Sequence, residues 1–254
     1  MMKRNNVNAK FNKFEQRNSI MQLFYTTDIS GTAATFSREE SGHCLRVLRM
    51  RKGDSLVFTD GKGIFFEGVI TGDDPAAMKV AITGAREESG KRQYNLHMAI
   101  SPLKNEDRLE WFIEKAVEIG IDEITPLICS RSEKKRIRKE RLDSIILSAM
   151  KQSVKASLPV LNEPVMFSEM VKREFGCRKL IATCDQEFER KAISEAFAPA
   201  DDLLILAGPE GDFTREEVIS AMEAGFVPVH LGRSRLRTET AGVAACCSVY
   251  LANI

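Results

Sequence analysis

Short apolar runs separated by turn-forming residues fill the chain from residue 21 to about residue 90, and this pattern is typical of β-strands. Two of these runs flank the sequence DGKG at 60–63, which favours a β-hairpin. A further strand is predicted over 78–83, and a helix over 37–50 has Ser37 as its candidate N-cap. Short strands, tight turns and a single helix predict a small β-barrel.

From residue 93 onward the apolar pattern changes, after the polar stretch REESGKRQ, which is typical of a linker. Continuous apolar runs now alternate with stretches in which apolar residues recur every three or four positions, as on one face of a helix. These helices are predicted over 105–120, 139–152, 214–225 and 239–253. Apolar strands that alternate with helices predict an α/β fold with a parallel sheet covered on both faces.

The N-terminal residues 1–20 are polar and rich in asparagine, and they show no periodic apolar positions. We expect a disordered extension there. A basic arm that contacts RNA is the alternative, because five cationic side chains stand against a single acidic one. The chain of 254 residues is long enough for two domains beyond this extension.

Composition excludes several classes of protein. No apolar run reaches the roughly 18 residues of a membrane span, and the N-terminus lacks the apolar segment of a secretory signal, so we expect a cytoplasmic protein without membrane contact. The six cysteines form no C-x-x-C pair, and none sits near a histidine at zinc-ligand spacing, so free thiols and no metal site are expected. Because the net charge is only +1, a nucleic-acid site would need local basic patches.

Two glycine-containing segments follow predicted strands, GPEGDFT at 208–214 and LGRSRLRTETA at 231–241. In an open parallel sheet, ligands bind beyond the carboxyl ends of the strands, where the next helices expose free N–H groups. An ordinary turn capped by Asp212 or Thr214 is the alternative for the first segment. Neither a P-loop lysine nor a G-x-G-x-x-G sequence is present, so two common nucleotide-binding motifs are excluded.

The second segment contains an arginine that local structure does not explain. Thr238 or Thr240 can cap the last helix, and Glu239 is favourable in its positive first turn. Arg237 has no comparable task, so it is a candidate for stabilising negative charge that develops in a reaction. A G-x-S-x-G motif is absent and the three histidines are scattered, which argues against a hydrolase triad.

Two basic stretches complete the candidate chemistry. HCLRVLRMRKGD contains Arg46 and Arg49, which are three positions apart and are therefore predicted to share one helical face. RSEKKRIRKER at 131–141 has seven basic and two acidic residues. A solvated charged face is the alternative for each stretch, whereas both beside one site would form a footprint for a phosphate backbone.

Four segments, in this order and at these distances, resemble the RsmE-type 16S ribosomal RNA uridine-N3 methyltransferases of the SPOUT superfamily: HCLRVLRMRKGD, LEWFIEKAVEIGIDEITPL, LAGPEGDFT and LGRSRLRTETA. The resemblance implies a PUA-like β-barrel over 21–90 that binds RNA. It also implies a SPOUT α/β methyltransferase domain over 93–254, with a parallel sheet and a trefoil knot. The implied methyl donor is S-adenosyl-L-methionine, the substrate is 16S rRNA, within the small ribosomal subunit, and the assembly is a homodimer with the last helix in its interface.

The resemblance also implies roles for individual residues. Arg237 would be catalytic and would face the reacting base. The cofactor-binding residues would be Gly208, Glu210, Gly211, Leu231, Gly232, Leu236, Thr238 and Thr240. The RNA-binding residues would be His43, Arg46, Arg49, Arg131, Lys134, Lys135, Lys151 and Lys155.

The chain departs from the family pattern in two places. Asp212 stands where the family often has a second glycine, and aspartate tolerates the left-handed backbone conformation better than most residues. Lys151 and Lys155 stand where glutamate and arginine are more usual, and lysine lacks the planar fork of arginine.

Two other functions stay open at this point. A catalytically inactive RNA-binding protein with the same fold is one, and the intact GPEG and LRTETA sequences argue against it. An unrelated methyl-transfer enzyme that acts on a small molecule is the other, and the basic patches and the N-terminal domain argue against it.

Overall fold

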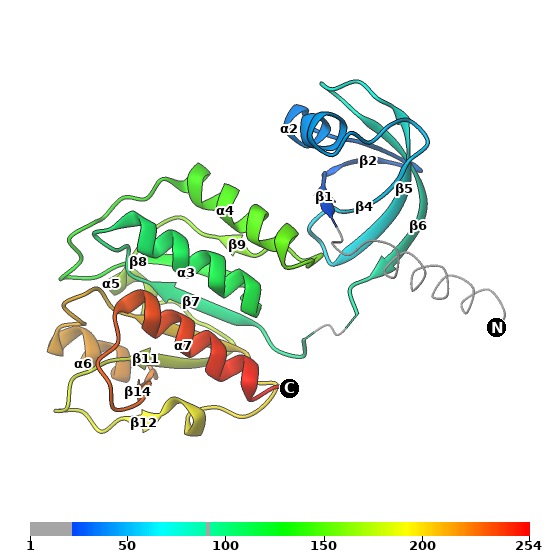
Figure 1. The fold of residues 1–254 in the computed structure, drawn as a ribbon. Coiled ribbons are helices and arrows are strands. Elements are labelled where there is room, and N and C mark those ends of the chain that lie inside the picture. The colour runs from blue at the N-terminus through cyan, green and yellow to red at the C-terminus, as the bar shows by residue number, and fades with distance from the viewer. Residues whose placement is uncertain (1–21, 90–91) are drawn as a thin grey trace, which may run out of the picture. The chain divides into compact units, whose positions relative to one another are not determined.

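The computed structural model describes residues 22–89 and 92–254, which divide into two compact units (Figure 1). The first unit contains the described residues up to Ser89 together with Lys151–Ser157, and the second contains the rest. The extension expected over 1–20 lies outside the described residues. No helix in the described part of the chain has the length and apolar character that crossing a membrane requires.

The first unit is a curled, six-stranded sheet (Figure 1). Its strands are β1 (Leu23–Tyr25), β2 (Asp28–Ser30), β3 (Ala33–Thr35), β4 (Ser55–Thr59), β5 (Ile64–Gly72) and β6 (Lys79–Glu87). They are ordered β1-β4-β5-β6-β3-β2, and only the β1–β4 pair is parallel. The predicted hairpin is confirmed as β4 and β5, but within the described residues β1 and β2 do not pair, so the sheet is a half-barrel rather than a closed one.

The concave face of this sheet holds an aromatic core. Phe36 and Phe58 are fully buried, and their rings meet edge to face at 5.3 Å. Such aromatic pairs contribute roughly 0.5–1.5 kcal/mol beyond the area that they bury. Residues 151–157 also belong to this unit, because the Ala156 carbonyl accepts hydrogen bonds from the Thr59 hydroxyl (2.9 Å) and the Gly63 N–H (3.0 Å).

The helix of the first unit is shorter than predicted. Ser37 caps α2 (Arg38–Gly42) as expected, and the helix continues as a π-helical segment over His43–Val47. Arg49 then adopts a left-handed conformation with φ 58°, which lets the Met50 N–H reach the Cys44 carbonyl at 3.2 Å. The prediction that Arg46 and Arg49 share a helical face is therefore wrong, because the helical segment ends at Leu48 and Arg49 lies beyond it.

The second unit is built on an all-parallel sheet, as predicted. Its strands are β7 (Leu96–Ile100), β8 (Glu123–Ile128), β9 (Val160–Leu161), β10 (Val165–Met166), β11 (Arg178–Ala182), β12 (Lys191–Ala192), β13 (Leu203–Ala207) and β14 (Val227–His230). The order is β10-β8-β7-β13-β11-β14-β12, and β9 also pairs with β8. All five residues of the central strand β13 are buried, which explains its uninterrupted apolar sequence.

Helices cover both faces of this sheet. They are α3 (Glu106–Ile119), α4 (Lys139–Gln152), α5 (Phe167–Met170), α6 (Arg215–Glu223) and α7 (Thr238–Leu251). Leu204 and Leu206 of β13 pack in one core with residues of α5 and α6. On the other face α3 and α7 lie side by side (Figure 1). A Cβ at Gly242 would lie 2.6 Å from the Phe112 ring, so glycine is needed for this close approach.

Helix α7 buries one side only. Gly242, Ala245, Cys246 and Val249 are buried, whereas Tyr250 and Leu251 are 41% and 62% exposed. The apolar run that ends the chain is therefore not covered all round within one copy.

Candidate active site

The two glycine-containing bends meet at the carboxyl edge of the parallel sheet, as the sequence predicts. They border a cavity of about 280 Å³. Ala182 at the end of β11 and Ala207 at the end of β13 are register partners, and both line it. Two neighbouring parallel strands thus open into one space, the position where such sheets bind ligands.

The structure brings only some of the predicted cofactor residues to this cavity. Those that line it are Gly208, Glu210, Leu236 and Thr238, and the predicted catalytic residue Arg237 lines it as well. The other four, Gly211, Leu231, Gly232 and Thr240, belong to the same two segments but do not line it. The structure adds Arg108, Cys184 and Arg235, which sequence reasoning missed. Of these, only Arg235 lies in a segment that the motifs singled out.

The bend at 208–214 is tightly folded. A Cβ at Gly208 would lie 3.1 Å from the Phe213 ring, so the backbone packs against that ring only without a side chain. Asp212 has φ 61°, the left-handed conformation expected at this position. Thr214 caps α6, and its side chain forms a reciprocal capping box with Glu217. Of the two alternatives, Thr214 is therefore the cap.

Carboxylates hold this bend to the loops that follow neighbouring strands. Glu210 Oε1 accepts a hydrogen bond from the Lys104 N–H (3.1 Å), which lies after β7. Glu217 Oε1 accepts one from the Ser130 N–H (2.8 Å), which lies after β8. Hydrogen bonds to charged groups are stronger than neutral ones, so the bend is well fixed before any ligand arrives.

Arg131 also holds the bend. Its Nη1 donates to the carbonyl oxygens of Gly211 (2.8 Å) and Phe213 (3.1 Å). The sequence suggested RNA binding for this arginine, because it stands in a basic stretch. Its two acceptors lie about eighty positions away in the chain, so no local pattern predicted this contact.

The loop at 231–237 is held far less. Gly232 has φ 115°, and its N–H donates to His230 Nδ1 at 3.3 Å. Within residues 22–89 and 92–254, the exposed side chains of Arg233, Arg235 and Arg237 have no hydrogen-bond or ion-pair partner. Arg235 and Arg237 therefore bring unneutralised guanidinium groups to the cavity.

The start of α7 differs from the prediction. Arg237 is the N-cap residue and makes no side-chain capping bond, while Thr238 and Glu239 open the helix and are buried. The predicted cap by Thr238 or Thr240 is thus wrong. The Glu239 carboxylate, 8% exposed, lies 3.8 Å from Arg108 Nε of α3. It gains from the positive helix end, as expected, and it also neutralises Arg108.

Cys184 is an exposed cysteine beside the cavity, and all six cysteines are free thiols. Burial raises the pKa of Cys44 to about 11 and that of Cys246 to about 12. Within the described residues, no three His, Cys, Asp or Glu side chains are grouped to hold a metal ion.

The predicted RNA-binding residues of the first unit are mostly accessible. Arg46 and Arg49 are exposed, and the Gln22 amide nitrogen lies 3.3 Å from Nε2 of half-buried His43. Lys151 instead pairs with the buried carboxylate of Glu40. Lys155 is half-buried and has a contact partner.

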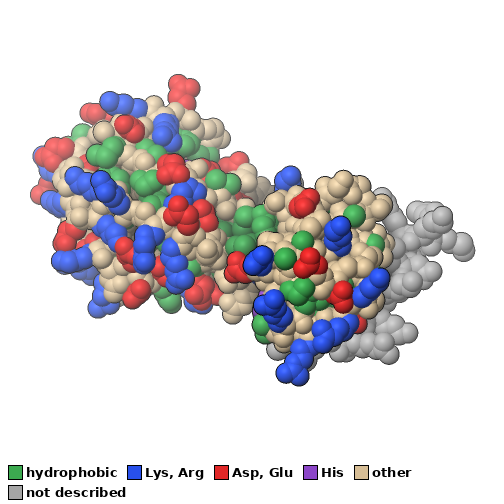
Figure 2. Space-filling view, turned by 90° about the horizontal axis from the view of Figure 1, so that it is seen from above, with side chains coloured by type: hydrophobic (Ala, Val, Ile, Leu, Met, Phe, Trp, Pro, Cys, Tyr) green, Lys and Arg blue, Asp and Glu red, His purple; other side chains and the backbone are tan. Residues whose placement is uncertain are grey.

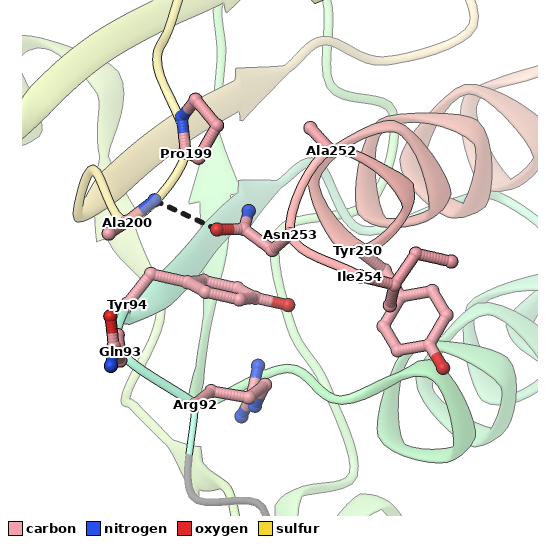
Figure 3. A pocket seen from close by; sticks show the side chains of 9 residues that line it. All are labelled: Arg92, Gln93, Tyr94, Pro199, Ala200, Tyr250, Ala252, Asn253 and Ile254. Carbon is pink, nitrogen blue, oxygen red and sulfur yellow. Dashed lines mark hydrogen bonds between the residues drawn. The ribbon is translucent and has the colours of Figure 1, made fainter.

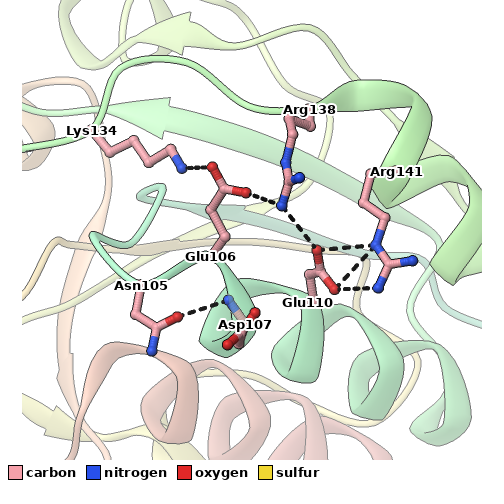
Figure 4. Close-up of polar contacts among 7 residues, drawn as sticks. All are labelled: Asn105, Glu106, Asp107, Glu110, Lys134, Arg138 and Arg141. Atoms are coloured by element: carbon pink, nitrogen blue, oxygen red, sulfur yellow. Dashed lines mark hydrogen bonds and ion pairs between the residues drawn. The ribbon is translucent and has the colours of Figure 1, made fainter.

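Acidic residues of α3 pair with three of the seven cations in the basic stretch at 131–141. Glu106 binds Lys134 and Arg138, and Glu110 binds Arg141 through Nη2 at 2.9 Å (Figure 4). Lys135 stays exposed. Figure 2 shows the same intermixing of basic and acidic side chains over the larger unit.

A larger hollow, of about 640 Å³, lies at the opposite end of α7 (Figure 3). Its main polar groups are already bound: Arg92 Nη2 lies 2.6 Å from the Asp122 carboxylate, and Asn253 Oδ1 accepts the Ala200 N–H at 2.8 Å. The smaller cavity therefore has the better arrangement for chemistry, since free guanidiniums and open strand ends converge there.

The chain is similar to known RNA methyltransferases over most of its length. The model of the RNA methyltransferase domain matches residues 90–250, and that of the RNA methyltransferase PUA domain matches residues 36–82. A solved structure from Porphyromonas gingivalis, described as a probable rRNA-methyltransferase, is 42% identical, covers 91% of this chain and 98% of its own, and gives a TM-score of 0.85.

Two further relatives are each called Ribosomal RNA small subunit methyltransferase E. The one from Neisseria gonorrhoeae, solved bound to S-adenosyl methionine, is 25% identical over 92% of this chain and 98% of its own, with a TM-score of 0.82. The one from Bacillus subtilis is 28% identical over 85% of this chain and 90% of its own.

Proposed function

The chain belongs to the RNA methyltransferase family, and on that premise we propose that it methylates N3 of a uridine in 16S rRNA of the small ribosomal subunit, with S-adenosyl-L-methionine as methyl donor. The observation that carries the proposal is the cavity shared by the bend at 208–212 and the loop at 231–237, with a free guanidinium on its wall. The small-subunit rRNA methyltransferases among the relatives, one solved with S-adenosyl methionine, support the choice of substrate and donor.

The cavity suits this methyl donor in size and chemistry. Its volume of about 280 Å³ is close to the lower end of the roughly 300–1,000 Å³ typical of ligand sites. Ala182, Ala207 and Leu236 supply apolar walls, while Glu210 and Arg235 supply opposite charges for a molecule that carries a sulfonium, an amino group and a carboxylate. The proposed cofactor site consists of Gly208, Glu210, Gly211, Leu231, Gly232, Leu236, Thr238 and Thr240.

Arg237 has the position and freedom to stabilise the reacting base. When bound, S-adenosyl-L-methionine supplies an electrophilic methyl group. Uracil N3 carries a proton, and its loss leaves negative charge on O2 and O4, next to which the Arg237 guanidinium would donate hydrogen bonds. Loss of one preorganised donor of this kind typically costs about 10²–10³ in kcat. The base must leave its stack to enter the cavity.

The first unit would bind the RNA as a PUA-like domain spanning 21–90, and 93–254 would form the methyltransferase domain with its trefoil knot. The exposed side chains of Arg46 and Arg49 are proposed to contact phosphates. His43, the first residue of the π-helical segment, is proposed to contact the RNA with them. The exposed Lys135 joins them from the second unit. Three of the predicted RNA-binding side chains already bind oxygen atoms within the protein, namely those of Arg131, Lys134 and Lys151. We therefore propose that they serve the fold first and contact RNA second.

The protein is proposed to act in the cytoplasm as a homodimer through α7. The exposed side of this helix carries Tyr250 and Leu251, and apolar surface of this kind is typical of interfaces. Light scattering should give twice the mass of the 28.4 kDa chain. A monomer at micromolar concentration would contradict this part.

The function is tested by two measurements. Calorimetry with S-adenosyl-L-methionine should give one binding site per chain. Mass spectrometry of rRNA nucleosides should show 3-methyluridine lost in cells lacking the protein and restored by the wild type. A protein that binds RNA but neither binds the donor nor transfers a methyl group would instead support the alternative of a catalytically inactive RNA-binding protein.

A further inference from the structure

Asp212 occupies a position that favours glycine. Its φ of 61° is left-handed, and a residue with a side chain adopts this conformation at a cost that glycine does not have. Asp212 also lines the cavity. A residue that is retained here against the backbone preference is expected to contribute through its side chain.

That side chain joins two walls of the cavity. Oδ2 of Asp212 accepts hydrogen bonds from the Thr183 hydroxyl (3.0 Å) and from the Cys184 N–H (2.7 Å). Oδ1 accepts the N–H of the adjacent Phe213 at 2.8 Å. One carboxylate therefore holds the bend and the end of β11 together, and all three bonds disappear if the residue is glycine.

The joined segment is part of the site. Ala182 and Cys184 both line the cavity, and Thr183 between them is only 4% exposed. The Thr183 hydroxyl also accepts the Asp185 N–H (3.2 Å), so the bonds of Asp212 extend into the following loop. A second link, between Arg215 and Glu187, is exposed at 65% and 68%, and such surface pairs hold little. Of these two side-chain links, the one made by Asp212 is therefore the stronger.

We propose that Asp212 is a positioning residue, which sets the segment 182–184 against the bend at 208–212 before the methyl donor binds. This inference rests on the proposed function. If segment 182–184 is already ordered, binding of the donor does not have to pay the entropic cost of ordering it. Asp212 is therefore expected to raise the affinity for the donor. The step from bound complex to product should depend on it much less.

The test is Asp212→Gly, which relieves the backbone and removes the three hydrogen bonds. Calorimetry should show the Kd for S-adenosyl-L-methionine raised about tenfold, with kcat at saturating donor within about threefold of the wild type and an unchanged Kd for RNA. Asp212→Asn keeps an acceptor for the Cys184 N–H and should recover part of the affinity. Thr183→Val removes one bond and should raise the Kd by about threefold.

Asp201→Gly is the matched control, because Asp201 caps the Ala198 N–H (2.8 Å) and pairs with Arg178 in a turn outside the cavity lining. It should lower the melting temperature while leaving the Kd for the donor unchanged. An Asp212→Gly protein with wild-type Kd, or with reduced kcat alone, overturns the inference. If Asp212→Gly does not fold, wild-type Kd values in both Asp212→Asn and Thr183→Val overturn it. A wild-type protein that binds no donor overturns the proposed function instead.

Discussion

The loops after β8 and β14 have similar sequences and opposite environments. Both begin with Arg-Ser and both are rich in arginine, RSEKKRIRKER at 131–141 and RSRLRT at 233–238. In the first, five cations are bound to carbonyl or carboxylate oxygens: Arg131, Lys134, Arg138, Lys139 and Arg141. In the second, Arg233, Arg235 and Arg237 have no such acceptor among the described residues.

The difference shows that the number of cationic residues in a loop does not reveal whether they stabilise the fold or are available to bind a ligand. Glu106 and Glu110 are one turn apart on α3 and present two carboxylates to the first loop (Figure 4). The second loop follows a strand whose end opens into the cavity. Among the described residues no carboxylate pairs with its arginines, although Glu210 and Asp212 line the same cavity. A bound arginine stabilises the fold, whereas a free one keeps its donors for a ligand.

The largest effect is expected from the second loop. Arg237→Ala should lower kcat for RNA methylation by at least about 10²-fold, because one charge-stabilising donor is lost, while the Kd for S-adenosyl-L-methionine changes little. Arg138→Ala is the control from the first loop, and it should keep wild-type turnover. Substantial turnover by Arg237→Ala would remove this arginine from the mechanism.

The comparison extends to the free arginines of the first unit. Arg46→Ala/Arg49→Ala should weaken RNA binding and reduce the slope of log K against log[salt] by about 1.4, if each residue contacts one phosphate of a single strand. Arg138→Ala/Arg141→Ala removes as much charge from bound positions and should leave the slope unchanged. Fluorescence anisotropy across a salt series measures both, and equal slopes for the two variants would erase the distinction.

Arg131 should behave as part of the scaffold. Arg131→Ala removes both donors to the bend carbonyls, so we expect the free energy of unfolding to fall by about 1 kcal/mol and the affinity for the methyl donor to fall with it. Arg235→Ala, which removes a free arginine, should change stability by less than about 0.5 kcal/mol. Urea unfolding separates them, and a loss of RNA affinity alone in Arg131→Ala would argue for the RNA role.

The smallest effect concerns the acceptor of the first loop. Hydrogen bonding from Arg141 lowers the pKa of Glu110 below its ordinary value of 4.5. A lowered acid pKa stabilises the fold above the ordinary value, and this contribution disappears as pH falls through the folded-state value. Glu110→Gln should therefore be slightly less stable than the wild type at pH 7, and the difference should disappear as pH falls through the lowered pKa of Glu110. A difference that persists in acid would show that packing, rather than charge, is responsible.

Local pattern determined the elements of this protein. Alternation and turn residues identified the β4–β5 hairpin, and the three-to-four-residue period identified α3, α4, α6 and α7. The meeting of the two bends also followed from sequence, because the carboxyl ends of parallel strands lie at one edge of a sheet. The elements depend on residues close together in the chain, and the meeting of the bends follows from the predicted parallel sheet, so the sequence contains both.

Only the tertiary structure decided which polar side chains already have a hydrogen-bond or ion-pair partner within the chain. Arg131 binds carbonyl groups far along the chain, Asp212 joins the end of β11, and Arg108 enters the cavity from α3. The early end of the helical segment before Arg49 was likewise not predicted from the local pattern. A hydrogen bond needs its acceptor within about 3 Å, and the partners of these residues come from other strands and helices, so their assignment requires the folded chain.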